Sequence, residues 1–520
     1  MVRKLYDLCI LAIELNLKHI PKLRINLPGY LRELLLHRLA LHNHLSPPHK
    51  PYVTYNLFSD SLKHINFSYC TQITDDLFCL LNDCGCKLTS FCLNTSLGFS
   101  VEGLANFLLA QDELEILKLK RLHTLSLLDS FEGKIRSTRL SELSFTYCDF
   151  MTDKILCSIG LYSKGITKLR LERMKLITDE GVVGLLKQQT EGKLIIFKVY
   201  RMFELSGKTL DSFSEFSPKL EQLIIPNCTK VSLLSIYTVL SKCGNLKVLD
   251  IPITTNLTGE TFGEIISQKW NSLQQLNISG NTIVPETMAL LSVAFPNLKK
   301  FYFGGTEINN SIFEQLLMNF NGLTTFDCMY CRNADQKTSE LISEYCHSLE
   351  TLAIGAWKLD GEGLLPLFEE NRALKLTSIE LTGCKNTSPR VLNSLIGNCK
   401  NLEVLFLRGI NAVDDQTVYD IANNLKQLKK ISFRGCTHIL LEESLVELIL
   451  ECRMLQMIGF PGLLCVRDRL IYVIADNLFD LEVLYIDGCN YVSSHALDYL
   501  RRKTTSTLYI EHKLVGAIHI

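Results

Sequence analysis

One apolar pattern recurs along almost the whole chain. It reads Leu-x-x-Leu-x-Leu-x-x-Cys-x-x-Ile-Thr-Asp and is clearest in residues 62–75 and 140–153. The first apolar position of each unit follows the previous one by 25 to 28 residues, at Leu62, Leu88, Leu114, Leu140, Ile166, Leu194, Leu220, Leu246, Leu273, Leu298, Leu323, Leu349, Leu376, Leu402, Leu428, Leu455 and Leu481. A period of this size is typical of a solenoid, in which each repeat buries its apolar face against its neighbours. The pattern therefore predicts one long repeat domain over residues 62–505.

Each unit contains the signals of a strand followed by a helix. The last two apolar residues of Leu-x-x-Leu-x-Leu are two positions apart, so they share one face of a short strand. The position after the strand, which we call the ladder position, is a cysteine in seven units: Cys70, Cys148, Cys228, Cys331, Cys384, Cys436 and Cys489. A thiol is small, readily buried and a weak donor. Pairs such as Thr152-Asp153 then predict helix N-caps.

This unit resembles the cysteine-containing leucine-rich repeat. The resemblance covers residues 62 to about 505. It implies an α/β solenoid of horseshoe form, with about seventeen repeats, strands on the inside and helices on the outside. Residues 506–520 are then expected to form a C-terminal cap.

Composition narrows the class of protein. The net charge is −1 and the chain contains no run of about 18 uncharged apolar residues, so we expect neither nucleic-acid binding nor a membrane span. Asp7 and Glu14 interrupt the apolar N-terminus, which makes a signal peptide unexpected. Many of the nineteen cysteines recur with the repeat, which favours reduced, buried thiols over disulfides. We therefore expect a cytoplasmic or nuclear protein.

No catalytic or metal-binding pattern stands out. Cys328-Met-Tyr-Cys331 has the spacing of a redox or zinc motif, but Cys328 occupies a strand position and Cys331 a ladder position. Cys84-Gly-Cys86 has no matching second pair, whereas structural zinc needs four converging ligands. Gly-rich phosphate loops and the common protease and esterase motifs are also missing from the sequence. We expect a non-catalytic protein without metal or cofactor.

The residues before the repeats form a separate segment. Residues 1–45 contain two predicted helices, and the Pro-containing stretch 46–61 is expected to link them to the first repeat. The first helix has an apolar face, made by Leu5, Leu8, Cys9 and Ile13. The second follows Leu27-Pro28, because proline is favoured in a first helical turn. One interpretation is a cap over the open edge of the solenoid, which such stacks require.

The same segment has a second interpretation, as a docking motif. Leu5-x-x-x-Cys9-x-x-x-Ile13 resembles the BC box that docks on elongin C, and Leu27-Pro28-x-x-Leu31-x-x-x-Leu35 resembles the cullin-2 box. Together, and followed by cysteine-type repeats, they resemble the VHL box of the zyg-eleven and zer-one family of cullin-2 ubiquitin-ligase substrate receptors. The resemblance implies elongin B/C contacts through Leu5, Leu8, Cys9 and Ile13, and cullin-2 contacts through Leu27, Pro28, Leu31 and Leu35. Alternatives are an F-box-type receptor and an adaptor-free binding scaffold.

A substrate would meet the outward-pointing residues of the strand face. In the early repeats many of these are basic, and neighbouring repeats should align them into a stripe: Lys118, Lys120, Arg121, Lys168, Arg170, Arg173, Lys198, Tyr200 and Arg201. Later repeats add the aromatic candidates Tyr302 and Tyr330 and a smaller patch of Arg408 and Arg434. Arginine binds carboxylates and phosphates bidentately, so the stripe predicts an acidic or phosphorylated protein segment as its ligand. The alternative is an ordinary solvated face.

Overall fold

The computed structural model describes residues 12–13, 16, 27–41, 45, 50–68, 70, 72–94, 98–123, 131–189, 192–254, 257–320, 322–357, 359–369, 375–504 and 508–512. Its contacts divide the chain into an N-terminal unit, residues 3–256, and a C-terminal unit, residues 257–520 with residues 1–2. Leu5, Leu8 and Cys9, predicted to contact elongin C, lie outside the described residues. Ile13 is described, in a helical conformation, and is partly buried.

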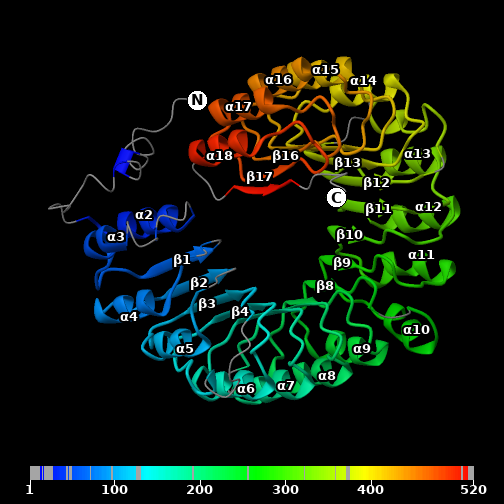
Figure 1. Cartoon of the computed structure of the whole chain (residues 1–520). Coiled ribbons are helices and arrows are strands. Elements are labelled where there is room, and N and C mark those ends of the chain that lie inside the picture. The colour runs from blue at the N-terminus through cyan, green and yellow to red at the C-terminus, as the bar shows by residue number, and fades with distance from the viewer. Residues whose placement is uncertain are drawn as a thin grey trace, which may run out of the picture. The chain divides into compact units, whose positions relative to one another are not determined.

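The N-terminal unit alternates strands and helices. Its described strands are β1 (His64–Ser68), β2 (Ser90–Asn94), β3 (Ile116–Lys120), β4 (Glu142–Thr146), β5 (Lys168–Glu172), β6 (Ile196–Tyr200), β7 (Gln222–Ile224) and β8 (Val248–Asp250). Its helices are α2 (Gly29–Leu41), α3 (Lys50–Leu57), α4 (Asp75–Asp83), α5 (Val101–Leu109), α6 (Asp153–Tyr162), α7 (Asp179–Lys187), α8 (Gly207–Phe216) and α9 (Leu233–Lys242). The strands form one parallel sheet, and the helices from α4 to α9 follow its outer side (Figure 1).

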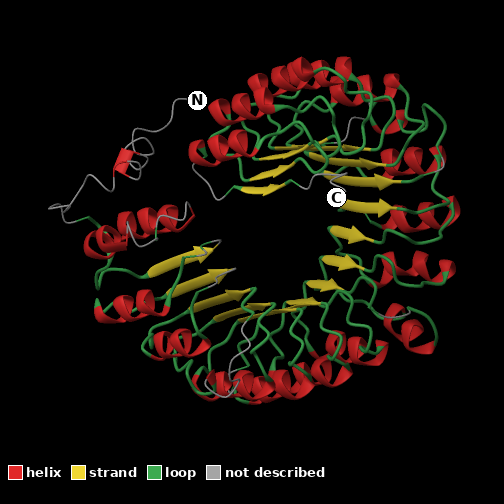
Figure 2. Cartoon of the chain, viewed as in Figure 1, coloured by secondary structure: helices red, strands yellow, loops and turns green. Residues whose placement is uncertain are grey.

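The C-terminal unit repeats this arrangement. Its strands are β9 (Gln275–Asn277), β10 (Lys300–Tyr302), β11 (Thr325–Met329), β12 (Thr351–Gly355), β13 (Ser378–Thr382), β14 (Val404–Arg408), β15 (Lys430–Ser432), β16 (Met457–Gly459), β17 (Val483–Tyr485) and β18 (Tyr509–Glu511). Its helices are α10 (Glu260–Ile266), α11 (Pro285–Ala294), α12 (Asn310–Asn319), α13 (Gln336–Tyr345), the short 3-10 helix η3 (Leu365–Leu367), α14 (Pro389–Asn398), α15 (Asp415–Asn424), α16 (Glu442–Glu451), α17 (Asp468–Asn477) and α18 (Ser494–Lys503). Figure 2 shows the same layering of strands and helices in this unit.

The strand register confirms the leucine-rich-repeat fold. Each strand pairs in parallel with the equivalent residues of the next repeat, as in Ile65 opposite Phe91 and Leu405 opposite Ile431. The strand residues that continue the Leu-x-x-Leu-x-Leu pattern face the helices and are buried, as are the leucines that open each unit. Burying one such side chain contributes about 1.5–3 kcal/mol. The chain is therefore an α/β leucine-rich-repeat solenoid within each unit.

The ladder position connects consecutive repeats. Cys148, Cys436 and Cys489 are buried, and each thiol donates to the carbonyl 29 residues earlier, at S···O distances of 3.3, 3.0 and 3.2 Å. Two residues that depart from cysteine make the same bond. The indole Nε1 of Trp357 donates to Cys328 O at 3.0 Å, and Oγ1 of Thr254 donates to Ile225 O at 2.8 Å. The bond to the preceding repeat therefore does not require cysteine, and Met174, Met202 and Ile410 fill the same buried position without a donor.

The Thr-Asp pair also acts across repeats. Thr152 Oγ1 and Thr178 Oγ1 accept helix N-terminal amides, as predicted. The following aspartate instead bonds the next repeat: Asp153 accepts from the backbone N–H and Oγ1 of Thr178, at 2.8 and 2.7 Å. Burial disfavours the ionised form of the equivalent Asp179, but hydrogen bonds from Ser206 and Thr209 outweigh it and lower its pKa. Each aspartate thus links two helix N-termini.

Helix α2 covers the exposed edge of β1. In most repeats, the two amides that open a strand donate to one carbonyl of the preceding repeat, as Thr89 and Ser90 do to Lys63 O. The first repeat has no predecessor, and Glu33 of α2 replaces that carbonyl. Its Oε1 accepts from Lys63 N at 2.7 Å and from His64 N at 2.9 Å. Helix α2 therefore acts as a cap on the edge of β1.

Two terminal segments differ from the predicted boundaries. The expected linker 46–61 contains helix α3, and Val53 and Leu57 on this helix are buried. Pro51 does not prevent this helix, because it falls at the second helical position, where the backbone N–H has no partner within the helix. At the other end, β18 lies within the expected cap 506–520 and extends the sheet, with Ile510 opposite Leu484. Among the described residues, no helix has the length and apolar character needed to cross a bilayer.

Candidate protein-binding face

The predicted basic residues on β3, β5 and β6 lie side by side. In the sheet register Lys118, Ser144, Arg170 and Lys198 occupy one row across four strands. The adjoining row contains Glu142 opposite Lys168. Outward strand positions recur in every repeat, so the parallel register converts a 26- to 28-residue spacing in sequence into direct neighbours.

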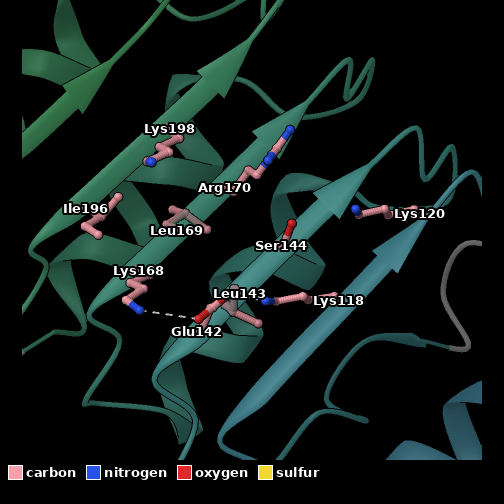
Figure 3. Close-up of a pocket in the computed structure, with 10 residues that line it drawn as sticks. All are labelled: Lys118, Lys120, Glu142, Leu143, Ser144, Lys168, Leu169, Arg170, Ile196 and Lys198. Atoms are coloured by element: carbon pink, nitrogen blue, oxygen red, sulfur yellow. Dashed lines mark ion pairs between the residues drawn. The ribbon is translucent and has the colours of Figure 1, made fainter. Parts of the chain in front are cut away.

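These residues surround a hollow of about 280 Å³, which we call the basic hollow (Figure 3). It is lined by Lys118, Lys120, Glu142, Leu143, Ser144, Lys168, Leu169, Arg170, Ile196 and Lys198. Five of these side chains are cationic and one is a carboxylate. Glu142 lies between two lysines, with N···O distances of 2.6 Å to Lys118 and 3.6 Å to Lys168. Burial opposes the ionisation of Glu142, yet the two lysines lower its pKa overall.

The remaining cations of the basic hollow are only partly neutralised. Arg170 pairs with Glu172 at 3.0 Å, and its guanidinium lies 5.0 Å from the ring centroid of Tyr200. Its buried Nε has no hydrogen-bond partner among the described residues. Neither Lys120 nor Lys198 has a carboxylate within ion-pair distance in the part of the chain that the structure describes. The hollow can therefore accept further negative charge.

Arg121, Arg173 and Arg201 do not line the basic hollow. They lie beyond the strand ends, one residue before the ladder position, and all three have a positive φ of 50 to 53°. Arg173 and Arg201 line a second hollow of about 510 Å³ with Tyr147, Met174, Lys175, Phe203 and Glu204. Phe203 and Lys175 are not among the binding residues that the sequence predicts. Both directly follow the ladder position, where the repeat pattern does not mark them. The position before the ladder, which holds Arg173 and Arg201, is glycine in most later repeats.

The candidates of the C-terminal unit form separate groups. Arg408 pairs with Glu380 at 2.9 Å and stacks over Phe406 at 4.8 Å, repeating the combination seen at Arg170. Arg434 is exposed in the next repeat, and its carbonyl accepts from Gly409. Tyr302 is partly buried on β10, whereas Tyr330 is 52 % exposed at a φ of 60°.

The predicted cullin-2 box is only partly accessible. Pro28 is exposed, and Leu27 and Leu31 are partly buried at the start of α2. Leu35 is 1 % exposed, because its four-residue spacing from Leu39 places both on the face that packs against the repeats. Leu35 therefore belongs to the cap and is not an accessible partner contact.

The closely spaced cysteine pairs differ in their surroundings. Cys328, Cys331 and Cys86 are buried, whereas Cys84 is half-buried and hydrogen bonding with Cys86 lowers its pKa to about 7. Cys328 donates to Ala353 O at 3.6 Å and Cys331 lies 3.5 Å from Thr306 Oγ1, and burial raises the pKa of both thiols. Cys84 and Cys86 both donate to the carbonyl of Leu81. Within the described ranges, no three His, Cys, Asp or Glu side chains are grouped so as to hold a metal ion.

No protein-family model matches the chain. Among solved structures, it is similar to a chain of the Rad7 and Elc1 complex from yeast, at 16 % identity over 95 % of this chain and 96 % of that one, with a TM-score of 0.37. It is also similar to the internalin inlF from Listeria monocytogenes, at 14 % identity over 65 % of this chain and 90 % of that one, with a TM-score of 0.34. At such low identities and TM-scores, any functional assignment depends on the residues of this chain.

Proposed function

We propose that this protein is a substrate-recognition subunit of a cullin-RING ubiquitin ligase. It binds an acidic or phosphorylated protein segment in the basic hollow and docks on elongin B/C and cullin-2 through its N-terminal segment. The observation that carries the binding role is the concentration of five cations around one carboxylate, in a chain whose net charge is −1. Such local complementarity steers and orients an acidic partner.

The adaptor role is supported by the residue pattern and by what α2 leaves accessible. The box resemblance assigns elongin contacts to Leu5, Cys9 and Ile13. Helix α2 buries one face on β1, while Pro28 remains exposed immediately before its first residue. One helix can therefore close the solenoid and still offer its N-terminal end to a cullin.

In this proposal the protein acts by positioning. The repeats supply a rigid surface for the substrate, and the N-terminal segment fixes that surface relative to the ligase. Other subunits perform ubiquitin transfer, while this chain contributes binding free energy and geometry.

A pull-down tests the proposal. Purified elongin B/C and cullin-2 are offered to the intact chain, to a Leu5→Ala/Cys9→Ala variant and to a Leu27→Ala/Pro28→Ala variant. We expect the first variant to lose both partners and the second to lose cullin-2 while retaining elongin B/C. Leu161→Ala is the matched control, because Leu161 is an exposed leucine, 57 % accessible, outside both boxes. Circular dichroism verifies folding of every variant.

A second candidate is an adaptor-free binding scaffold. The observation that favours it is the role of α2 as a cap, in which Glu33 and the buried Leu35 are already engaged by the first repeat. Failure of the intact, folded chain to capture elongin B/C would support this candidate. Capture of the F-box adaptor instead would support the F-box alternative.

A further inference from the structure

One position of the repeat adopts a left-handed backbone in both units. It is the residue immediately before the ladder position, and its φ lies between 50 and 81° in the described repeats from Arg121 to Gly488. Its N–H donates to the carbonyl at the end of the next strand, as Tyr147 does to Glu172 O at 3.0 Å and Gly409 to Arg434 O at 2.8 Å. The positive φ therefore extends the hydrogen-bond ladder one step beyond the strands.

Glycine is the expected residue at such a position, because it has no Cβ to clash in the left-handed region. The C-terminal unit uses glycine in seven repeats, at Gly280, Gly305, Gly383, Gly409, Gly435, Gly462 and Gly488. A Cβ built on Gly409 or Gly435 meets nothing closer than 3.6 Å, so backbone conformation rather than space favours glycine there. The N-terminal unit instead carries large side chains in four consecutive repeats, at Arg121, Tyr147, Arg173 and Arg201.

Three of these side chains come together at the second hollow. The guanidinium of Arg173 lies 4.7 Å from the ring centroid of Tyr147, and Arg201 lines the same hollow of about 510 Å³. Phe203 contributes an aromatic ring that is 55 % exposed. An exposed aromatic ring beside two arginines, one of them stacked on a tyrosine, is the composition of an interaction hot spot.

The charges around this hollow are unbalanced. Its nearby carboxylates already have partners: Glu204 lies 2.7 Å from the ammonium of Lys230, and Asp149 lies 2.7 Å from His123 Nδ1 and 3.9 Å from the ammonium of Lys175. Arg173 and Arg201 have no carboxylate within ion-pair distance in the described parts of the chain. An incoming ligand can therefore supply carboxylates without displacing an existing pair.

We infer that this rim, formed by Tyr147, Arg173, Arg201 and Phe203, is a second protein-binding site. Its ligand is an acidic segment of a partner polypeptide in which an aromatic residue is flanked by carboxylates. The aromatic ring packs between Tyr147 and Phe203, and the flanking carboxylates pair with the two guanidiniums. The site is distinct from the basic hollow, and it holds whether or not the N-terminal segment engages an adaptor.

The left-handed backbone provides an unusually clean test. Replacing Arg173 and Arg201 by glycine removes the guanidiniums and gives the backbone its preferred residue. The probe is a fluorescein-labelled peptide containing Asp-Asp-Phe-Asp-Asp, measured by anisotropy with the full chain. We expect the Arg173→Gly/Arg201→Gly variant to bind about ten-fold or more weakly, as the loss of two charge-assisted pairs implies. Its urea midpoint should stay level or rise.

Matched variants and peptides separate this site from its alternatives. Ile253→Gly changes the same backbone position outside the hollow and should not alter binding. Lys118→Ala/Lys198→Ala alters the basic hollow, and should change affinity for this probe by less than about two-fold if the sites are independent. Peptides with Asn in place of Asp, or Gly in place of Phe, should bind much more weakly.

Several results would overturn the inference. One is unchanged affinity in the Arg173→Gly/Arg201→Gly variant, and another is no binding by the intact chain. A fall in the urea midpoint together with lost binding would assign both arginines a structural role. Tighter binding of a phosphoserine peptide that lacks the aromatic residue would identify phosphate, rather than an acidic aromatic segment, as the ligand chemistry.

Discussion

A single residue can carry a conformational cost that its neighbours in other repeats avoid. Ile253 is β-branched and 55 % exposed, yet it has a φ of 52° at the position where later repeats use glycine. The left-handed conformation costs an L-residue about 1–2 kcal/mol. Glycine avoids this cost, but it loses about 0.5–1 kcal/mol more conformational entropy on folding. Little apolar burial is available to offset the difference.

Ile253→Gly should therefore stabilise the protein by about 0.5–1 kcal/mol. Urea unfolding followed by circular dichroism measures the change. The matched control is Ile195→Gly, an isoleucine that is 37 % exposed and is not among the residues with positive φ. That control should be destabilising, and a lower midpoint for Ile253→Gly would contradict the explanation.

Glu142 sets the charge of the basic hollow. Lys118 and Lys168 keep its pKa low, so it is ionised at neutral pH and cancels part of the positive field. Glu142→Gln keeps the side-chain shape and removes that charge. We expect a Glu-rich peptide to bind about two- to five-fold more tightly, corresponding to about 0.5–1 kcal/mol. Isothermal titration calorimetry at pH 7 measures the affinity of the peptide for both proteins. Unchanged affinity would mean that the peptide binds elsewhere.

Asp179 should contribute pH-dependent stability. Its carboxylate accepts from Ser206 N, Ser206 Oγ and Thr209 Oγ1 at 2.9, 2.6 and 2.6 Å, and its folded-state pKa is lowered. A lowered pKa stabilises the folded state above the unfolded pKa of about 3.9 and loses that effect as pH falls through the folded value. Asp179→Ala should cost about 2–3 kcal/mol at pH 7 and progressively less below about pH 4.

The neighbouring Glu180→Ala is the control for Asp179, because Glu180 is exposed. Its effect should remain within about 0.5 kcal/mol. Urea midpoints across a pH series separate the two variants. A cost for Asp179→Ala that does not diminish in acid would show that packing, rather than the carboxylate, supports the junction.

At the scale of the element, the first strand receives from a helix the acceptor that most later strands receive from the preceding repeat. The carboxylate of Glu33 accepts both amides that open β1, and α2 buries Leu35, Leu36 and Leu39 beside them. Without this carboxylate, two strand amides would lose their acceptor at the edge of the sheet.

Glu33→Ala should destabilise the first repeat by about 2–3 kcal/mol, because two charge-assisted hydrogen bonds are lost. Hydrogen exchange should become faster at Lys63 and His64, with little change at Lys430 in β15, which has a carbonyl acceptor from Glu403. Glu33→Gln retains an acceptor oxygen and should show a smaller effect. Unchanged protection in Glu33→Ala would rule out the carboxylate as the cap.

Some features of the elements could be predicted from the sequence, and others could not. Strands, ladder residues and Thr-Asp caps were predictable because each depends on short-range spacing that recurs. The bonding of Asp179 to the next repeat and of Glu33 to β1 depends on contacts 27 to 31 residues away, which periodicity alone does not reveal. The burial of Leu35 was missed because one apolar helix face fits a cap and a docking motif equally well.

For the molecule as a whole, a net charge near zero coexists with a strongly basic local surface. The chain has 54 basic and 55 acidic side chains, yet the basic hollow carries five cations against one carboxylate. The alignment of basic residues was predictable from the repeat spacing. The separation of Arg173 and Arg201 into another hollow was not, since it depends on a backbone turn made by residues other than glycine.

This charge distribution should make ligand binding, but not folding, sensitive to salt. The Debye length falls from about 10 Å at 0.1 M to about 3 Å at 1 M ionic strength. Affinity of a Glu-rich peptide for the full chain should therefore fall steadily as sodium chloride is raised, while the urea midpoint changes little because the core is apolar. Salt-independent binding would show that apolar contacts, rather than the hollow's cations, provide the affinity.

The parallel register also has a consequence for how the chain is made. Each strand finds its partner only 25 to 28 residues along the chain, a length that a ribosome adds in about one to five seconds at about 5–20 residues per second. Because α2 and Glu33 are synthesised before β1, the acceptor for the opening amides of β1 is already present when this strand emerges from the ribosome. Each later repeat can then settle on the one before it during translation, so the binding surfaces near the N-terminus are complete while the rest is still being synthesised.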